Sequence, residues 1–344
     1  MTRLFTPIQL RGVTARNRIM MSPMSQARAD EQGVAQMWHA VHYGSRAVGG
    51  VGLLLMEDTA ISEAGRLNQH SLGMYDDAHV AALRHIVEFC RGQGACVGAQ
   101  LGHAGPKAWS KTEGQGPLRP VSPSGRLFAE GWVLPSVLTV EEIASVLDQW
   151  RAAARRAVAA SYDFVEVHAG HGYLINAFLS PLTNARDDAY GRDRTRLLFE
   201  SVAAVREVIP LEMPVFVRLS VEDLVPGGWT LADTQRLAGR LREAGVDALD
   251  LSWGGIGPTQ GPLTLEERRN ATRRVREAAR LPVVAVGLVE SAQGAEAILG
   301  EGTADIVAIG RLLLRNPYWA LDAAEALAGD LPLAVTSPYG IGAR

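Results

Sequence analysis

Short apolar runs recur along the whole chain, and each is followed by a stretch whose apolar residues recur at helical spacing. The runs lie at residues 18–21, 51–56, 95–101, 162–167, 215–219, 248–252, 283–286 and 306–309. Because they are nearly continuous rather than alternating with polar residues, they predict strands buried on both faces, which is typical of parallel sheets. Eight parallel strands alternating with helices predict an α/β fold of the (β/α)8 TIM-barrel type.

The segments between the runs predict helices and two further features. Helices are expected at 38–48, 78–91, 139–160, 194–208, 230–244, 265–280, 292–299 and 318–327. The third helix begins with Thr139 and Glu142, which have the spacing of a capping box. We also expect an N-terminal hairpin around Arg11–Gly12 and a long loop at 105–135, after the third strand. Loops of that length are often functional lids.

An open, doubly wound sheet is the alternative fold for alternating strands and helices. That fold needs a glycine-rich fingerprint directly after its first strand. The residues at that place are Ser22, Pro23, Met24 and Ser25, which do not form one. The barrel is therefore favoured. Because no boundary interrupts the alternation, residues 1–344 are predicted to form a single domain.

The composition argues against several functional classes. The 344 residues are 47% hydrophobic and carry a formal net charge of −3, which favours a globular protein that binds neither nucleic acid nor an anionic membrane surface. No apolar run reaches the roughly 18 residues of a membrane span, and the N-terminus lacks an apolar signal segment. The two cysteines, Cys90 and Cys96, have no metal-binding spacing and are expected to be reduced thiols. We therefore expect a cytoplasmic protein without a metal site.

The clearest chemical signal follows the fourth run. His168, His171 and Tyr173 come directly after the strand predicted at 162–167, and small residues separate them. Small residues let the chain turn sharply, so that the three side chains can converge. In α/β barrels the carboxyl ends of the strands carry the chemistry. The pattern indicates an active site, and structural histidines bonded to loop backbone are the alternative interpretation.

Glycines end the last two runs. Gly287 follows the seventh run, and Gly310 and Arg311 follow the eighth. In barrels these two loops commonly bind a phosphate through backbone N–H groups. Simple turn glycines are the alternative, but the two loops together favour a phosphate site.

Arg218 and Gln100 are expected to point into the mouth of the barrel. A buried, unpaired guanidinium is costly, so Arg218 should meet an anion or a polar ring, with a salt bridge to a neighbouring carboxylate as the alternative. Gln100 offers both a donor and an acceptor, which suits an amide-like edge. With a phosphate at the last two loops, these residues predict bound flavin mononucleotide (FMN), whose pyrimidine edge meets Gln100 and Arg218.

These motifs resemble the Old Yellow Enzyme family of FMN-dependent ene-reductases, in particular its shorter bacterial branch, which has a His–His pair. The resemblance covers most of the chain, with motifs in the family's order at Ser22–Met24, Gln100–Gly105, Val167–Leu174, Leu179–Asn184, Val217–Ser220 and Ile309–Arg311.

The resemblance implies a role for each matched residue. The residues implied to bind the flavin are Ser22, Pro23, Met24, Ser25, Asp58, Gln100, Arg218, Gly287, Gly310 and Arg311. His168 and His171 would hold a substrate carbonyl oxygen, and Tyr173 or water would supply a proton. NADPH or NADH would reduce the flavin, and flavin N5 would pass a hydride to the C=C bond of a small α,β-unsaturated carbonyl compound. The family also implies a homodimer or homotetramer.

The chain departs from the family's pattern near this site. Ser25 stands where the short branch usually has Cys, Ala27 where it has Tyr, and Asp58 where it has a small residue. Tyr339 is expected to replace an Arg near the end of the chain and, with Ala27 and Trp253, to line the substrate pocket. These departures motivate a second hypothesis, a flavin-dependent dehydrogenase or isomerase of a specialised substrate. A third is a non-redox barrel that binds a phosphosugar without flavin.

Overall fold

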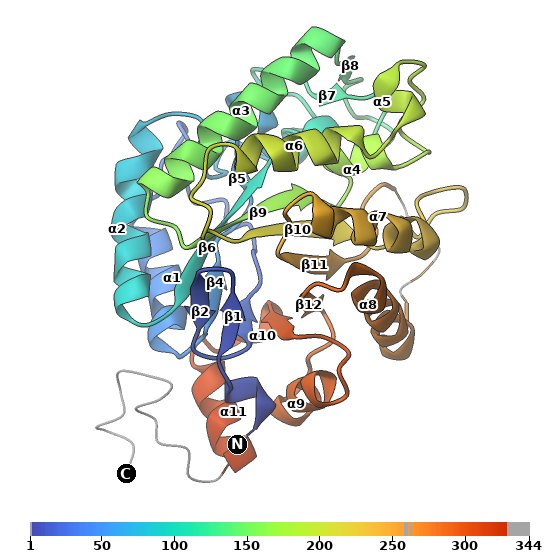
Figure 1. The fold of residues 1–344 in the computed structure, drawn as a ribbon. Helices are drawn as coiled ribbons and strands as arrows, with labels where there is room; N and C mark the ends of the chain where they lie inside the picture. The colour runs from blue at the N-terminus through green and yellow to red at the C-terminus, as the bar shows by residue number, and fades with distance from the viewer. Residues whose placement is uncertain (1, 258–260, 262, 329–344) are drawn as a thin grey trace.

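The computed structural model describes residues 2–257, 261 and 263–328, and these residues form a closed barrel (Figure 1). Within them, eight parallel strands make up the wall: β3 (Ile19–Met21), β4 (Leu53–Leu55), β6 (Cys96–Gly102), β9 (Phe164–Ala169), β10 (Val215–Ser220), β11 (Ala248–Ser252), β12 (Val283–Val286) and β13 (Ile306–Ile309). β3 pairs with both β13 and β4, and β4 pairs with β6, which closes the ring. The predicted (β/α)8 barrel is confirmed.

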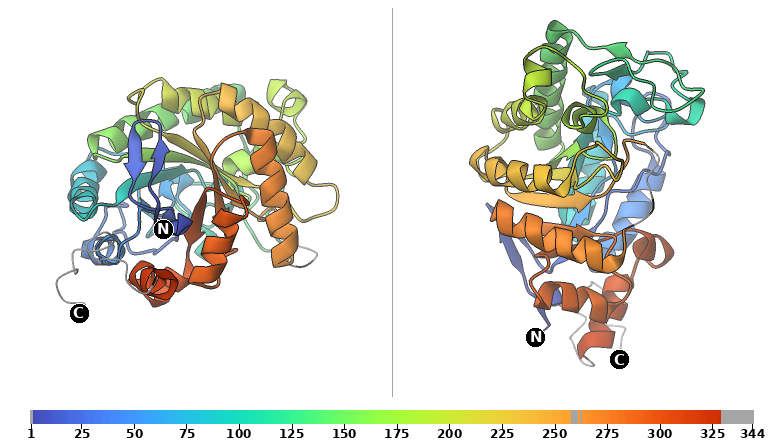
Figure 2. Two further views of the ribbon diagram at one scale, coloured as in Figure 1. Left: turned by 60° about the horizontal axis from the view of Figure 1, so that its bottom comes forward. Right: turned by 90° about the vertical axis from the view of Figure 1, so that its right-hand side faces the viewer.

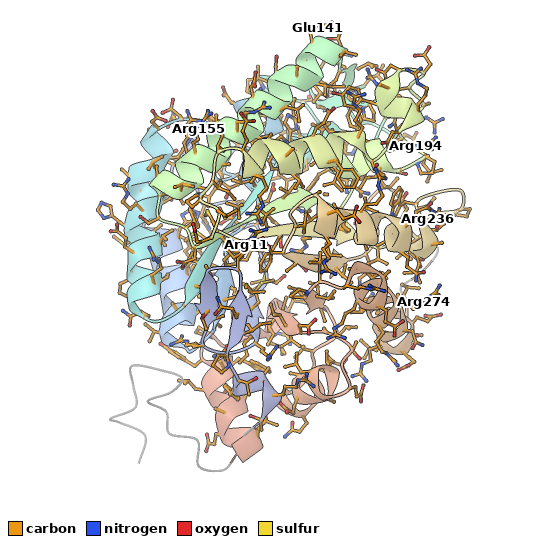
Figure 3. The ribbon with its side chains drawn as sticks, in the orientation of Figure 1. Arg11, Glu141, Arg155, Arg194, Arg236 and Arg274 are labelled. Carbon is orange, nitrogen blue, oxygen red and sulfur yellow. The ribbon has the colours of Figure 1, made fainter. Side chains whose placement is uncertain are left out.

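Helices cover the outside of the barrel (Figure 2). The longer ones are α1 (Met37–Val48), α2 (Ala78–Gly92), α3 (Val140–Ala159), α6 (Arg196–Arg206), α7 (Leu231–Glu243), α8 (Leu265–Ala279), α9 (Ala292–Gly300) and α11 (Trp319–Ala328). Their apolar faces pack on the strands in one continuous buried cluster. Charged side chains face outward, as Figure 3 shows for Arg155 on α3, Arg236 on α7 and Arg274 on α8. None of the described helices has the length and apolar character that a bilayer span requires.

Threonine caps fix the starts of several helices. Thr139 accepts a hydrogen bond from the Glu142 N–H, and the Glu142 carboxylate accepts one from the Thr139 N–H at 2.7 Å. The predicted capping box is confirmed. Thr230 and Thr264 begin α7 and α8 in the same way. Each such cap typically contributes about 1 kcal/mol of stability.

The predicted hairpin, β1 (Ile8–Leu10) and β2 (Val13–Ala15), closes the amino-terminal end of the barrel. Its buried side chains join one apolar cluster with inward-facing residues of the barrel strands, including Met20, Leu53, Phe164 and Phe216. Because this end is filled with apolar side chains, the polar interior of the barrel is confined to its carboxyl end.

Several short elements are not apparent from the sequence pattern. They are η1 (Arg3–Phe5), β5 (Thr59–Ala60), η2 (Glu63–Gly65), α4 (Leu174–Leu179), α5 (Ala189–Arg192) and α10 (Arg311–Arg315). α4 is buried on every side, so its residues show no polar face from which helical periodicity could be read. The long loop after β6 contains η3 (Gly105–Lys107), η4 (Ser110–Thr112), β7 (Val121–Ser122) and β8 (Ser136–Val137).

Candidate active site

A layer of polar side chains crosses the carboxyl half of the barrel. It consists of Gln100 on β6, Glu166 on β9, Arg218 on β10 and Asp250 on β11, which are consecutive strands of the ring. The Gln100 amide donates to Glu166 Oε1 at 2.8 Å, and Arg218 Nε lies 3.5 Å from Asp250 Oδ2. In each pair the two residues are register partners on neighbouring strands. The salt bridge that was the alternative for Arg218 is therefore present.

Arg218 balances the charge of this layer. Burial raises the pKa of Glu166 well above its usual range, Asp250 raises it further, and Arg218 opposes the rise. Burial also raises the pKa of Asp250, again opposed by Arg218. Arg218 is only 4% exposed, and its Nε has no hydrogen-bond partner within the described part of the chain. The guanidinium thus neutralises buried carboxyl groups, and its Nε faces the Asp250 carboxylate.

A pocket of about 590 Å³ lies beside this layer, and this volume suits a cofactor. We call it the flavin pocket, and the predicted residues that line it are Ser22, Pro23, Met24, Arg218, Gly287, Gly310 and Arg311. Gly287 has a φ of +72°, a backbone conformation that favours glycine. A Cβ on Gly310 would lie 3.3 Å from Met24 Sδ. The glycine loops after β12 and β13 therefore meet the loop after β3 in one wall.

Other residues predicted to bind the flavin do not line this pocket. Gln100 and Asp58 are buried. Gln100 is held by Glu166 in the polar layer, whereas Ser25 is exposed.

The residues predicted to line the substrate pocket are also spread. Ala27 is partly buried and has a φ of +52°, so the loop after β3 turns there. Trp253, directly after β11, is partly buried and packs against the main apolar cluster. Tyr339 lies outside the described residues, so its position stays a prediction.

His168, His171 and Tyr173 meet at the carboxyl end of β9. The centre of the His168 ring lies 5.0 Å from that of the His171 ring and 4.9 Å from that of the Tyr173 ring. The expectation that His168 follows the strand is wrong, because β9 continues to Ala169. Its ladder with β10 pairs His168 with Arg218. His168 is therefore fixed by the barrel wall, while His171 and Tyr173 belong to the loop.

A backbone hydrogen bond defines which nitrogen of His168 carries a proton. The Gly170 N–H donates to His168 Nδ1 at 3.2 Å, so a neutral His168 has its proton on Nε2. That N–H faces His171 Nδ1 at 3.2 Å, and His171 Nε2 contacts the Ser252 hydroxyl. Ser252 ends β11, and the sequence pattern does not single it out as a site residue. Because a hydroxyl both donates and accepts, Ser252 can serve either tautomer of His171.

Both imidazoles are neutral near pH 7. Burial lowers the pKa of His168 well below its usual range, and nearby His171, Arg218 and Lys107 lower it further. Burial, followed by Arg218 and Lys107, lowers the pKa of His171 in the same direction. The site therefore presents neutral N–H donors, not cations.

Asp58 is a buried carboxyl group beside Tyr173. It is 6% exposed, and neither of its oxygens has a hydrogen-bond partner among the described residues. Burial raises the pKa of Asp58 to about 7, against the opposing charge of Arg218. Burial also raises the pKa of Tyr173, and Asp58 raises it further. Tyr173 therefore stays protonated near neutral pH.

The loop that carries His171 has an unusual backbone. His171 has a φ of +59° and Gly172 a φ of +74°. Lys107 Nζ donates to the His171 carbonyl oxygen at 2.7 Å, and the His171 N–H donates to Ser220 Oγ at 2.9 Å. A non-glycine residue in this region costs about 1–3 kcal/mol and persists only where its surroundings fix it. Lys107 and Ser220 provide that support.

Replacing Gly172 with Ala is expected to destabilise the protein by about 1–3 kcal/mol. The residue has a positive φ, and an added Cβ would overlap the carbonyl oxygen of Gly255. Denaturant unfolding measures the loss. Gly92→Ala at the end of α2 is the matched control, because a Cβ there meets nothing within 4 Å. The control should keep or slightly raise stability, and an equally stable Gly172→Ala variant would contradict this loop conformation.

Neither cysteine belongs to this site. Cys90 and Cys96 are free thiols, and burial raises the pKa of each to about 12. Such thiols are poor nucleophiles. The described residues contain no group of three His, Cys, Asp or Glu side chains arranged to hold a metal ion.

Comparisons with known proteins extend over nearly the whole chain. The family described as NADH:flavin oxidoreductase / NADH oxidase matches residues 3–330. NADPH dehydrogenase of Geobacillus sp. (strain WCH70) is 41% identical over 343 residues, which cover 98% of each chain. The structure of morphinone reductase in complex with tetrahydroNAD matches with a TM-score of 0.81 and 30% identity, over 98% of this chain and 95% of that one. The old yellow enzyme homologue from Zymomonas mobilis matches with a TM-score of 0.78 and 28% identity, over 98% of both chains.

Proposed function

The chain belongs to the NADH:flavin oxidoreductase / NADH oxidase family and is an FMN-dependent NAD(P)H oxidoreductase of the Old Yellow Enzyme type, and we propose that it reduces the C=C bond of α,β-unsaturated carbonyl compounds. One observation carries this proposal. His168 and His171 are buried, neutral imidazoles beside the Tyr173 phenol. Paired neutral donors suit a carbonyl oxygen, which only accepts hydrogen bonds.

The residues of the flavin pocket fit FMN. Backbone N–H groups of the Gly287 and Gly310 loops, together with the Arg311 guanidinium, would hold the phosphate. Arg218 lines the pocket and would bind the pyrimidine edge, and Gln100, in the polar layer beside it, would join it there. When bound, FMN supplies the hydride that reduces the alkene.

The two histidines would stabilise the negative charge that develops on the substrate's carbonyl oxygen. His168 would donate from Nε2, the nitrogen that Gly170 leaves protonated. The substrate oxygen would replace the contact between the two rings, and His171 would donate to it from Nδ1 once the Ser252 hydroxyl donates to its Nε2. One such donor typically contributes about 3 kcal/mol to catalysis. Ser252 is thus proposed as a positioning residue that selects the His171 tautomer.

Tyr173 would supply the proton that completes the reduction, with water as the alternative donor. Its phenol lies beside His168, and its raised pKa keeps the proton in place until carbanion character develops at the substrate. Lys107 Nζ lies 5.8 Å from the centre of the Tyr173 ring and donates to the His171 carbonyl oxygen. Lys107 would therefore orient the loop that carries both groups.

Anaerobic spectroscopy of the purified protein tests this function. NADPH should bleach the flavin absorbance, and cyclohexenone should restore it with formation of cyclohexanone. Flavin that stays oxidised with both NADPH and NADH would contradict the proposal. A colourless protein that FMN does not reconstitute would favour the non-redox phosphosugar barrel.

The environment of Asp58 bears on the direction of the reaction. Asp58 interacts with Arg218, which lines the flavin pocket. Where it is ionised, above about pH 7, its carboxylate would oppose negative charge on the reduced flavin and so favour transfer of the hydride away from the flavin. This supports alkene reduction over the alternative dehydrogenase or isomerase. A saturated ketone such as cyclohexanone should then leave the flavin oxidised. Bleaching by the saturated ketone would favour the alternative.

Asp58 also predicts a pH-dependent stability. The pKa of Asp58 in the folded protein, about 7, exceeds its ordinary value of about 4. The contribution of Asp58 to stability is therefore fully present below about pH 4 and is lost as the pH rises through about 7. Asp58→Asn cannot ionise and is expected to exceed the wild type in free energy of unfolding by on the order of 1–3 kcal/mol at pH 8, and by less at pH 5. Denaturant unfolding of the flavin-loaded protein measures both. An equal difference at the two pH values would contradict the assignment.

We propose the homodimer or homotetramer that the family implies, in the cytoplasm. Exposed apolar side chains on neighbouring helices support an interface between copies, with Met37 77%, Val41 65% and Phe89 49% exposed. Cys90 and Cys96 are free thiols, which suits a reducing compartment. Light scattering of the purified protein measures the assembly, and the mass of a single chain would contradict it.

A further inference from the structure

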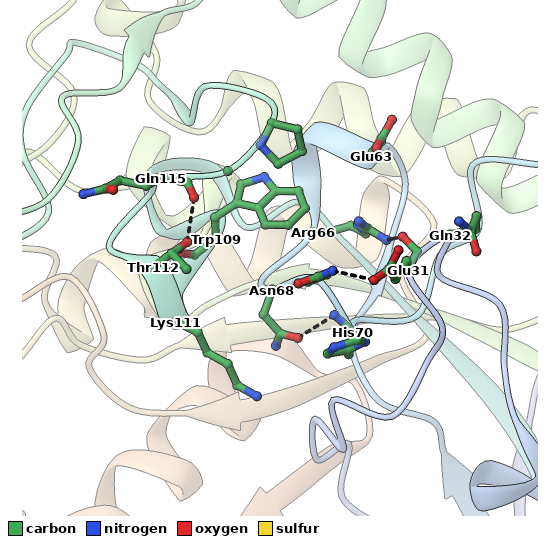
Figure 4. Close-up of a pocket in the computed structure, with 13 residues that line it drawn as sticks. Glu31, Gln32, Glu63, Arg66, Asn68, His70, Trp109, Lys111, Thr112 and Gln115 are labelled. Carbon is green, nitrogen blue, oxygen red and sulfur yellow. Dashed lines mark hydrogen bonds between the residues drawn. The ribbon is translucent and has the colours of Figure 1, made fainter.

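A second pocket lies outside the flavin pocket, over the loops that follow β3, β4 and β6 (Figure 4). Its volume is about 640 Å³. We call it the outer pocket, and the residues that define it are Glu31, Glu63, Arg66, His70, Trp109 and Lys111. None of its lining residues lines the flavin pocket, so the two are separate spaces at the same end of the barrel.

The outer pocket adjoins the candidate active site through a small apolar cluster. Trp109, in its wall, packs with Leu67 and Tyr173 in that cluster. Backbone hydrogen bonds fix the wall, because the Trp109 N–H donates to the Arg66 carbonyl at 3.2 Å and the Ser110 N–H to the Leu67 carbonyl at 2.8 Å. Trp109 therefore contacts both the outer pocket and Tyr173, which makes the pocket and the candidate active site neighbours.

Buried polar atoms at this pocket lack partners. Arg66 is 2% exposed and Trp109 6% exposed, and the guanidinium lies 5.1 Å from the centre of the indole ring. Arg66 Nη1 donates to the Glu31 carbonyl oxygen at 2.7 Å. Arg66 Nε and Trp109 Nε1 have no hydrogen-bond partner among the described residues. Arg66 and Trp109 therefore give the pocket a fixed polar wall whose hydrogen-bonding capacity the described residues do not fully use.

The pocket combines groups of several kinds. Figure 4 shows Glu31 and Glu63 on the Arg66 side of Trp109, with Lys111 and Gln115 on the other side. Arginine and lysine bind phosphate, carboxylates bind ribose hydroxyls, and side-chain amides read the edge of a base. A simple anion would contact only the cationic side chains, Arg66 and Lys111. An adenosine phosphate would use all three kinds of group.

We propose that the outer pocket binds the adenosine-phosphate end of a molecule whose other end reaches the flavin pocket. This inference rests on the nicotinamide-dependent function proposed above. The same chemistry occurs in two sources, the 2′-phosphorylated adenosine of NADPH and the 3′-phosphorylated adenosine of a coenzyme A thioester. Lys111 would bind the phosphate, and Glu63 the ribose.

Calorimetry with the flavin-loaded protein tests binding without turnover. The probes are adenosine 2′,5′-bisphosphate and adenosine 3′,5′-bisphosphate. Binding of either is expected, and Lys111→Ala should weaken it about tenfold or more, because a charge-assisted hydrogen bond is lost. Glu63→Gln should weaken it as well. Tighter binding of the 2′,5′ compound assigns the pocket to NADPH, and tighter binding of the 3′,5′ compound assigns it to a thioester. No binding, or binding that neither variant changes, overturns the inference.

A kinetic comparison separates this inference from the proposed function. The reductants are NADPH and 1-benzyl-1,4-dihydronicotinamide, which has no nucleotide. If NADPH is the ligand, Lys111→Ala should lower the ratio of their kcat/KM values for flavin reduction about tenfold. Arg155→Ala on the outside of α3 is the matched control and should leave the ratio unchanged. If calorimetry assigns the pocket to NADPH, an unchanged ratio in Lys111→Ala overturns the inference about the outer pocket but leaves the proposed reductase function standing. Failure of both reductants with wild type overturns the function.

Discussion

Replacing His171 with Ala is expected to lower kcat/KM for cyclohexenone by about 10²–10³-fold, the cost typical of removing one oxyanion donor. The variant loses the only ring that links His168 Nε2 to the Ser252 hydroxyl in the described structure. Stability should change less than activity, because water that fills the space of the lost ring can bond to the His168 imidazole and the Ser252 hydroxyl. Steady-state kinetics of the flavin-loaded protein measures the effect.

Binding of a phenol separates this loss from a general disruption of the site. A phenol such as p-hydroxybenzaldehyde should give a charge-transfer band with wild type, and His171→Ala should weaken it. Ser252→Ala is the companion variant, because it keeps both imidazoles but removes the group proposed to set the tautomer. It should give a smaller loss in the same direction. If His171→Ala reduces cyclohexenone and binds the phenol as well as the wild type does, the histidine pair has no part in the mechanism.

Replacing Arg218 with Ala is expected to destabilise the protein by about 3–5 kcal/mol, the usual cost of removing one partner of a buried ion pair. Asp250 would lose its partner, and Glu166 would lose the positive charge that opposes its raised pKa. The pKa values of both carboxyl groups would rise further. Their contribution to stability is then present at low pH and lost as the pH rises, so the variant should weaken with increasing pH.

Flavin content gives a second readout for Arg218. Arg218 lines the flavin pocket, so Arg218→Ala should also retain less FMN than wild type. Arg236→Ala is the matched control, because Arg236 pairs with Asp233 on the exposed surface of α7. Surface pairs contribute about 0–1 kcal/mol, so this control should stay near wild type. Full stability and full flavin content in Arg218→Ala would contradict its role in the polar layer.

The barrel could be predicted because its strands are buried on both faces. That burial leaves a continuous apolar run in the sequence, as at 215–219 and 306–309. Such a run can be recognised even where the ends of the neighbouring helices are predicted inexactly. α4 escaped prediction for the opposite reason, since a short helix buried on all sides has no polar stripe. His168 lies inside β9 because its ladder with β10 extends to Ala169, which local sequence does not reveal.

The residues of the flavin pocket could be predicted because each follows or ends a strand of the barrel, and the histidines and the tyrosine because they lie close together in the chain. His168, His171 and Tyr173 occupy one short stretch, so their convergence followed from spacing. Ser252 and Lys107 lie 81 and 64 residues from His171, and only closure of the barrel brings them to it.

The polar layer did leave a trace in the sequence. Glu166 and Asp250 are carboxylates inside otherwise apolar strands, at positions that pair with the strands of Gln100 and Arg218. Charged residues within a buried run are costly unless they are paired, so each one indicates an interior partner. The outer pocket left no such trace, because it is formed by loops from three separate β–α units.

A crystal structure of the protein with FMN and p-hydroxybenzaldehyde is the most direct test of the whole account. We expect the flavin phosphate at the Gly310 and Arg311 loop, its pyrimidine edge against Arg218, and the phenol oxygen within hydrogen-bond distance of both His168 and His171. Flavin absent from that pocket, or a phenol bound away from the two imidazoles, would contradict the account.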